Sequence, residues 1–155
     1  MDAKKALNII AAQCGKKECC SADVAARLRR WELSERDVAA IMEFLVKHRF
    51  VDDARFAEAY ARDKSRFNRW GRLKIARMLR LKQIPEAVIG QALAAIPEEG
   101  EDGHCLELLR QKARALKETD AYKRKAKLYR FAVGRGFDHD TVSRALGLLA
   151  RDAEE

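Results

Sequence analysis

The chain has 155 residues and a formal net charge of +8, and 48% of its residues are apolar, which is enough for one ordinary domain or several small cores. No apolar run reaches the roughly 18 residues of a membrane span, and no signal-peptide core follows the first residues, so we expect a cytoplasmic protein without a membrane partner. The four cysteines form no C-x-x-C pair, which favours buried thiols over a zinc site or a disulfide.

The first part of the chain, residues 1–50, has the periodicity of three helices. Ser21 and Ser34 stand where helix N-caps are expected, and an acid follows Ser34 three residues later, as in a capping box. We therefore predict a first three-helix repeat. The expected helices cover residues 3–14, 21–31 and 34–48.

A second repeat is predicted over residues 51–97. Asp52 stands at the start of its first helix, and Val51 and Phe56 have the spacing of a hydrophobic staple. The expected helices cover residues 53–67, 71–82 and 85–96.

An acidic segment, residues 98–103, follows the second repeat and contains two glycines. This composition predicts a flexible linker. A third repeat is predicted after it, over residues 104–155. The expected helices cover residues 103–117, 122–134 and 138–151.

One helix entry recurs in the three repeats with a period of about 51 residues, which is typical of stacked modules. Its copies are Leu33-Ser34 with Val38, Ile84-Pro85 with Ile89, and Phe137-Asp138 with Val142. Because no useful length of chain alternates with period two, we predict an all-α fold of tandem three-helix repeats. Such repeats would form an elongated, curved array, which suits binding along another polymer better than enclosing a small substrate.

Basic residues are concentrated in two stretches. Residues 62–82 contain nine basic residues and one acid, and residues 110–135 contain ten basic residues and two acids. This segregation is typical of a surface that binds a polyanion, and the alternative is a solvated helix face without a partner. Trp70 lies among arginines on a predicted turn, where it would either stack on a base or close the helix bundle.

The second helix of the second repeat separates its apolar and basic residues. At about 100° per residue, Ile75, Met78 and Leu79 lie on one side, and Arg77 and Arg80 lie on the opposite side. The two arginines are therefore expected to be available to a partner.

The same repeat contains two characteristic strings. Residues 48–62 read HRFVDDARFAEAYAR, and they are followed by WGRLKI at residues 70–75 and LRLKQI at residues 79–84. The D-D-x-R-F-A-x-x-Y string, together with the basic G-x-x-x-I helix, resembles the central signature of the RecX family, bacterial regulators of the RecA recombinase. That family is built of tandem three-helix repeats, in agreement with the periodicity.

The resemblance implies a non-enzymatic protein that lodges in the groove of the RecA filament on single-stranded DNA and restrains ATP hydrolysis, strand exchange and filament growth, in DNA repair by homologous recombination and the SOS response. We expect a monomer with no cofactor or metal, and weak contact with single-stranded DNA that is independent of sequence. The residues expected to contact phosphate or an acidic recombinase surface are Arg66, Arg69, Arg72, Lys74, Arg77, Arg80, Lys123, Arg124, Lys125 and Lys127.

The chain departs from the family pattern at the turn after the second helix of a repeat. The family commonly has glycine there, whereas this chain has Glu32 and Gln83 in the first two repeats and Gly136 in the third. A left-handed backbone at a residue other than glycine costs on the order of 1 kcal/mol, so these turns are expected to be strained or different. Met78 also replaces a glutamate that is frequent in the family.

The sequence is also compatible with two other classes of protein. Residues 21–46 also resemble a helix-turn-helix, which would indicate a regulator of transcription that binds duplex DNA, but another helical pattern follows and leaves no room for a wing. Asp52, Asp53 and Glu58 are of the residue type that binds metal in nucleases. The two aspartates, however, stand at a helix start, where acids are favoured as caps.

Overall fold

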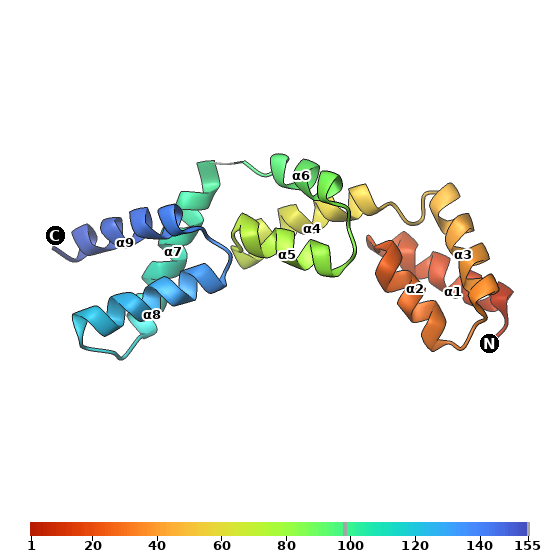
Figure 1. Ribbon diagram of the computed structural model, residues 1–155, viewed down its shortest axis with the longest axis horizontal. Helices are drawn as coiled ribbons and strands as arrows, with labels where there is room; N and C mark the ends of the chain where they lie inside the picture. Colours follow the sequence, from red (N-terminus) through yellow and green to blue (C-terminus); the bar gives the residue numbers. More distant parts are fainter. Residues whose placement is uncertain (98, 155) are drawn as a thin grey trace. The chain divides into compact units, whose positions relative to one another are not determined.

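The computed structural model describes residues 1–97 and 99–154, and this part of the chain contains nine helices and no strand (Figure 1). The prediction of an all-α fold is confirmed, and all helices but one begin within one residue of their predicted start. None of the described helices combines the length and the apolar character needed to cross a bilayer. The helices are α1 (Ala3–Lys16), α2 (Ser21–Arg30), α3 (Glu35–Lys47), α4 (Asp53–Asn68), α5 (Arg72–Leu81), α6 (Glu86–Ala94), α7 (Glu99–Ala115), α8 (Ala121–Gly134) and α9 (His139–Glu154).

Residues Met1–Tyr60 and Leu79–Ala92 form one compact unit, unit 1. Its core joins α1, α2 and α3, whose buried apolar residues recur three or four positions apart and so line one side of each helix. The buried residues of this core are Ala6, Ile10, Cys14, Cys19, Val24, Leu28, Val38, Ile41, Leu45 and Val51.

One of the two predicted serine caps is confirmed and the other is wrong. The Ser34 side chain caps α3 by accepting a hydrogen bond from the backbone N–H of Asp37 at 3.1 Å. Ser21, in contrast, is already the first residue of α2, and its backbone N–H donates to Oδ1 of Asp53 at 2.7 Å. A carboxylate from α4 therefore caps α2 in place of a local serine. Local sequence patterns do not predict this contact, because Asp53 is distant from Ser21 in the sequence.

The Asp52 carboxylate caps α4, because its Oδ1 accepts a hydrogen bond from the backbone N–H of Arg55 at 3.0 Å. The Arg55 side chain then ties this helix start to two other segments: Nε lies 2.7 Å from Oε1 of Glu18, and Nη2 donates to the carbonyl of Arg49 at 3.0 Å. Asp52 thus caps its own helix, as predicted, whereas Asp53 caps the start of α2. Across residues 1–97 and 99–154, no group of three or more His, Cys, Asp and Glu side chains is arranged to hold a metal ion.

The turns after the second helix of each repeat share a left-handed residue. The φ angle is 60° at Glu32, 62° at Gln83 and 98° at Gly136. A left-handed backbone is the conformation that favours glycine, and this chain adopts it at two of the three turns with residues that carry a Cβ atom. The turns at Glu32 and Gln83 are therefore strained, whereas glycine accepts this conformation at Gly136.

The second compact unit, unit 2, comprises residues Ala61–Met78 and the chain from Leu93 onward. In it, α7 packs along α9, and α8 packs against both. The buried residues of this core are Cys105, Leu108, Leu109, Leu128, Ala132, Phe137, Val142, Ala145 and Leu146.

The acidic segment does not form the predicted flexible linker. Helix α7 begins at Glu99, so the prediction of a linker over residues 98–103 is wrong for residues 99–103, while residue 98 lies outside the described residues. Acids are favoured in the first turn of a helix because the backbone N–H groups there carry partial positive charge. The acidic run therefore indicates a helix start, even though it contains two glycines.

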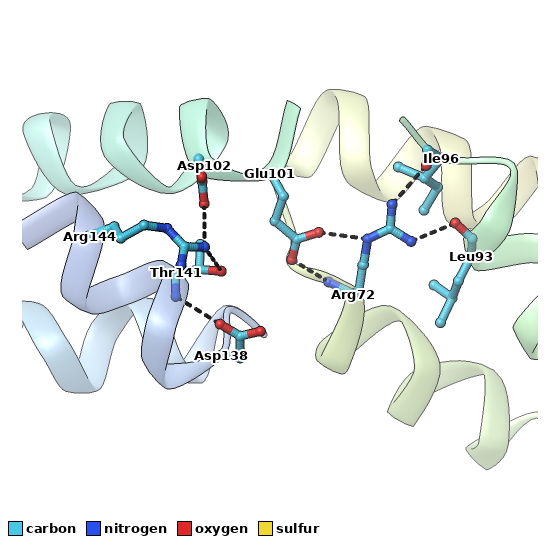
Figure 2. A network of polar contacts seen from close by, with 8 residues as sticks. All are labelled: Arg72, Leu93, Ile96, Glu101, Asp102, Asp138, Thr141 and Arg144. Atoms are coloured by element: carbon cyan, nitrogen blue, oxygen red, sulfur yellow. Dashed lines mark hydrogen bonds and ion pairs between the residues drawn. The ribbon is translucent and has the colours of Figure 1, made fainter. Parts of the chain in front are cut away.

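Two carboxylates of this segment also have arginine partners within unit 2 (Figure 2). Glu101 accepts a hydrogen bond from the backbone N–H of Arg72 at 3.0 Å, and its other oxygen lies 3.0 Å from Nε of the same arginine. Asp102 Oδ1 lies 3.1 Å from Nη2 of Arg144 on α9. These contacts hold the start of α7 against α5 and α9.

A close backbone contact within unit 2 joins the start of α5 to the turn after α8. The N–H of Gly71 donates to the carbonyl of Arg135 at 2.8 Å, and the N–H of Leu73 donates to the carbonyl of Gly136 at 3.1 Å. A Cβ atom on either glycine would overlap the opposite backbone. Glycine is therefore required at both positions by space, and at Gly136 by φ as well.

The cysteines are buried free thiols, as predicted. Burial raises the pKa of Cys14 and of Cys105 to about 12. Both thiols are therefore protonated at neutral pH and are poor nucleophiles in the folded chain.

Candidate nucleic-acid interface

The residues predicted to bind a polyanion come from three parts of the chain. Arg66 lies near the end of α4, and Arg69 lies on the following turn, where its φ is 53°. Helix α5 carries Arg72, Lys74, Arg77 and Arg80, and helix α8 carries Lys123, Arg124, Lys125 and Lys127. The structure divides these ten residues into internal braces, surface ion pairs and side chains without a carboxylate partner.

Arg72 is an internal brace, and its contact with a partner stays a prediction. Its Nη1 donates to the carbonyl of Leu93 at 2.6 Å, its Nη2 donates to the carbonyl of Ile96 at 2.7 Å, and its Nε pairs with Glu101 (Figure 2). The guanidinium thus uses its donors on the end of α6 and the start of α7. Sequence alone gives no sign of this role, because the acceptors are more than 20 residues away.

Arg124 has a similar internal role at the end of α7. Its Nη2 donates to the carbonyl of Ala113 at 2.6 Å, and its Nη1 donates to the carbonyls of Leu116 at 3.1 Å and Glu118 at 3.2 Å. An arginine in this place satisfies carbonyls that the helix end leaves without partners. Arg124 is therefore an internal brace as well, and its contact with a partner stays a prediction.

Arg80 and Lys127 lie on the surface but have acidic neighbours. Arg80 pairs with Glu86, and Nζ of Lys127 lies 3.1 Å from Oε1 of Glu118. The predicted faces of α5 are confirmed, since Ile75 is fully buried and Arg80 is exposed, but Arg80 is not free as expected. Exposed ion pairs of this kind are weak and can exchange partners.

The other six candidates are Arg66, Arg69, Lys74, Arg77, Lys123 and Lys125. Among the residues that the structure describes, no carboxylate lies within ion-pair distance of these six side chains. Their charge is consequently available to an external anion. Four of them belong to the second repeat, so the strongest unpaired basic surface lies there.

Two lysines lie over the Trp70 ring within unit 2, and two arginines lie close enough to one of these lysines to repel its charge. Nζ of Lys64 lies 4.9 Å from the centre of the indole ring, and Nζ of Lys74 lies 4.3 Å from it. The pKa of Lys74 is lowered by burial and then by repulsion from Arg135, Arg77 and Lys64. We call Trp70 and these four cations the Trp70 cluster. The half-buried indole is thus covered by ammonium groups, in addition to any role in closing the bundle.

Two members of the Trp70 cluster, Lys64 and Arg135, are absent from the residues predicted as sites. Lys64 belongs to the first basic stretch, so the sequence could have predicted it as a contact residue by the same criterion as its neighbours. Arg135 comes from the third repeat, and its carbonyl accepts the hydrogen bond from Gly71. Its guanidinium lies 5.0 Å from the centre of the Phe131 ring, and its charge repels that of Lys74. The glycine of the W-G-R string and the second glycine of G-R-G were the only signals in the sequence for the contact of Gly71 with the turn after α8.

A second candidate surface lies on the third repeat, where α7, α8 and α9 line an open groove of about 1230 Å³. Lys125 lies at this groove, and so does Tyr122, whose side chain is 84% exposed. Lys123 is exposed nearby on α8. The groove is mostly apolar, so it is less suited to a polyanion than the Trp70 cluster.

Comparison with known proteins gives the same family in three ways. A family model described as the second three-helix domain of RecX matches residues 52–93, and one described as the third matches residues 101–146. The regulatory protein RecX of Chlorobium phaeobacteroides (strain BS1) is 32% identical over 150 residues, which is 97% of each chain. That of Clostridium acetobutylicum is 33% identical over 130 residues, which is 80% of this chain but 59% of the relative.

The fold agrees with this similarity of sequence. The crystal structure of RecX from Lactobacillus salivarius superposes with a TM-score of 0.80 at 18% identity and covers 96% of both chains. A second crystal structure of a regulatory protein RecX gives a TM-score of 0.84 at 21% identity, over 94% of this chain and 71% of the other. The D-D-x-R-F-A-x-x-Y signature, which begins at Asp52, stands at the start of α4. Together with the matches of sequence and of family models, it shows that the chain belongs to the RecX family.

Proposed function

We propose that this chain is a non-enzymatic, cytoplasmic regulator of the RecA recombinase. It acts as a monomer that binds in the groove of the RecA filament on single-stranded DNA and inhibits ATP hydrolysis, strand exchange and filament extension. The observation that carries this proposal is the unpaired basic surface of the second repeat, in a chain of the RecX family.

The charge of this surface supports a polyanionic partner. Arg66, Arg69, Lys74 and Arg77 have no described carboxylate to neutralise them, so contact with a partner's phosphates or acidic side chains would gain attraction without breaking an internal ion pair. Phosphate contact alone gives weak binding that does not depend on sequence, as we propose for free single-stranded DNA. A filament groove offers phosphates together with protein, which would add affinity.

The acids of the second repeat support a role other than catalysis. Asp52 and Asp53 have the residue type of a nuclease metal site, but each carboxylate accepts a hydrogen bond at a helix start. Both oxygens in these contacts serve the fold. We therefore propose that the second repeat binds and restrains its partner rather than cleaving it.

The test is DNA-dependent ATP hydrolysis by RecA in the presence of the wild-type chain and of Arg77→Glu. Arg77 is exposed and belongs to the Trp70 cluster, so the change should cost less than about 0.5 kcal/mol of stability and sharply relieve inhibition. Arg36→Glu is the matched control, because it makes the same charge change at an exposed site of α3 outside both basic stretches. Equal inhibition by all three folded chains would contradict the proposal.

A further inference from the structure

We propose that the Trp70 cluster is a binding site for a phosphate group, and that in the filament this group is a phosphodiester of single-stranded DNA. The inference deepens the proposed function, on which it rests only for the source of the phosphate. It assigns a ligand to side chains from two repeats, of which the sequence singled out only Lys74 and Arg77 as contact residues.

The geometry keeps two ammonium groups in fixed places. Lys64 and Lys74 both lie within 5 Å of the centre of the Trp70 ring, inside the range of cation–π attraction. The backbone N–H of Trp70 donates to the carbonyl of Lys64 at 3.1 Å, which holds the turn after α4 in place. The indole therefore orders the lysines without neutralising their charge.

The positive charges near the Trp70 ring favour the binding of an anion. Within residues 1–97 and 99–154, no carboxylate lies within ion-pair distance of Lys74, Arg77 or Arg135. The lowered pKa of Lys74 reflects burial and the repulsion of its three basic neighbours. A phosphate placed among them would replace this repulsion by several charge-assisted hydrogen bonds, which arginine and lysine form well with phosphate oxygens.

The aromatic content favours nucleic acid over an acidic protein surface. Phe67 precedes Trp70 by three residues, and its side chain is 72% exposed. The guanidinium of Arg66 lies 5.4 Å from the centre of the Phe67 ring. Proteins bind single strands with this combination, in which cations follow the backbone and exposed rings receive bases. An acidic protein segment would use the cations and leave Phe67 in water.

Arg135 makes the site depend on two repeats. Its carbonyl accepts the hydrogen bond from Gly71, so Arg135 lies near Lys74 only while the turn after α8 is docked on the start of α5. A ligand that binds only this docked arrangement must also stabilise it. Phosphate binding is thus expected to fasten the third repeat to the second within unit 2.

The first experiment monitors Trp70 fluorescence in a Trp31→Phe chain, since the sequence contains two tryptophans. The probes are a short oligothymidylate, pyrophosphate and polyglutamate. We expect saturable changes with oligothymidylate and pyrophosphate. Lys74→Gln should weaken oligothymidylate binding roughly tenfold, the loss of one hydrogen bond to a charged group. Arg62→Gln is the control, because Arg62 is exposed on α4 and two residues from Lys64, so it points to another side of the helix.

The second experiment uses the wild-type chain and measures proton uptake by calorimetry in buffers of different ionisation enthalpy. A phosphate beside Lys74 raises its lowered pKa, so binding of oligothymidylate at alkaline pH, where part of Lys74 has lost its proton, takes up protons, and the uptake disappears in Lys74→Gln. Lys74→Arg should keep the affinity and lose the uptake, because arginine stays charged.

The outcomes separate this site from the proposed function. If the chain binds the filament but Trp70 fluorescence does not change with oligothymidylate or pyrophosphate, the phosphate site is overturned and the proposed function stands. If Trp70 fluorescence changes with oligothymidylate but the chain does not bind the filament, the proposed function is overturned and the phosphate site stands. Preference for polyglutamate over oligothymidylate overturns the choice of nucleic acid. Tighter binding of pyrophosphate than of oligothymidylate at equal phosphate concentration supports a phosphate site and overturns DNA as its source.

Discussion

A single side chain, that of Arg72, joins three segments of unit 2. Its guanidinium reaches the carbonyls of Leu93 and Ile96 and the carboxylate of Glu101, and its own backbone N–H binds the same carboxylate (Figure 2). Because a basic residue in a basic stretch has this internal role, charge counted along the sequence overstates the surface that is available to a partner.

Substitution of Arg72 therefore predicts a loss of stability rather than of binding charge alone. Arg72→Met should lower the free energy of unfolding by about 1–3 kcal/mol, because the carbonyls and the carboxylate lose their shared donor. Arg66→Met, at an exposed position, should change it by less than about 0.5 kcal/mol. Urea denaturation of the two variants is the check, and equal midpoints would show that Arg72 does not brace unit 2.

At this scale, the sequence predicts what a residue does within its own helix. The buried positions of Ile75 and Leu79, the cap at Ser34 and the outward direction of Arg77 all follow from spacing. It does not predict contacts such as Asp53 with Ser21, which form only after distant elements pack. Periodicity gives the direction of a side chain but not the atoms that another helix brings to it.

Among the elements, the turns after α2 and α5 carry a testable strain. Gln83 has a φ of 62°, so Gln83→Gly should stabilise the chain by about 1 kcal/mol after the entropy of glycine in the unfolded state is counted. Gln83→Ala is the control, since it keeps the Cβ atom and should bring no gain. Thermal melts that rank alanine equal to glycine would show that the backbone conformation is not the source of strain.

Gly136 predicts the opposite result at the third turn. Gly136→Ala should destabilise the chain by about 1–3 kcal/mol from backbone strain, with a further loss because the new Cβ atom would overlap Lys74. The same thermal melts check it. A variant as stable as the parent would mean that the contact with Gly71 is not tight.

Helix starts were predictable at this scale because caps and apolar spacing are local signals. Helix α7 is the exception, and the cause is the acidic run before Gly103. The same residues favour a flexible linker by composition and a helix start by electrostatics. The arginines at positions 72 and 144, which decide between the two, lie far away in the sequence.

For the whole molecule, the elongated, curved array and the repeat boundaries at residues 50, 97 and 104 stay predictions. Modules in series contact mainly their neighbours, so we expect a radius of gyration clearly above the ~15 Å of a compact chain of this length. Small-angle scattering measures it directly. A value near ~15 Å would mean that the repeats fold back on one another.

The central claim is that the chain recognises the filament through the basic surface of the second repeat. Co-sedimentation at near-physiological salt tests it most directly, with the RecA–single-stranded DNA filament, RecA alone and DNA alone, using the wild-type chain, Arg77→Glu and Arg36→Glu. The account predicts that wild type and Arg36→Glu sediment with the filament far more than with either component, and that Arg77→Glu stays in the supernatant. Equal sedimentation of Arg77→Glu with the filament, or no preference of the wild type for the filament over DNA alone, would contradict it.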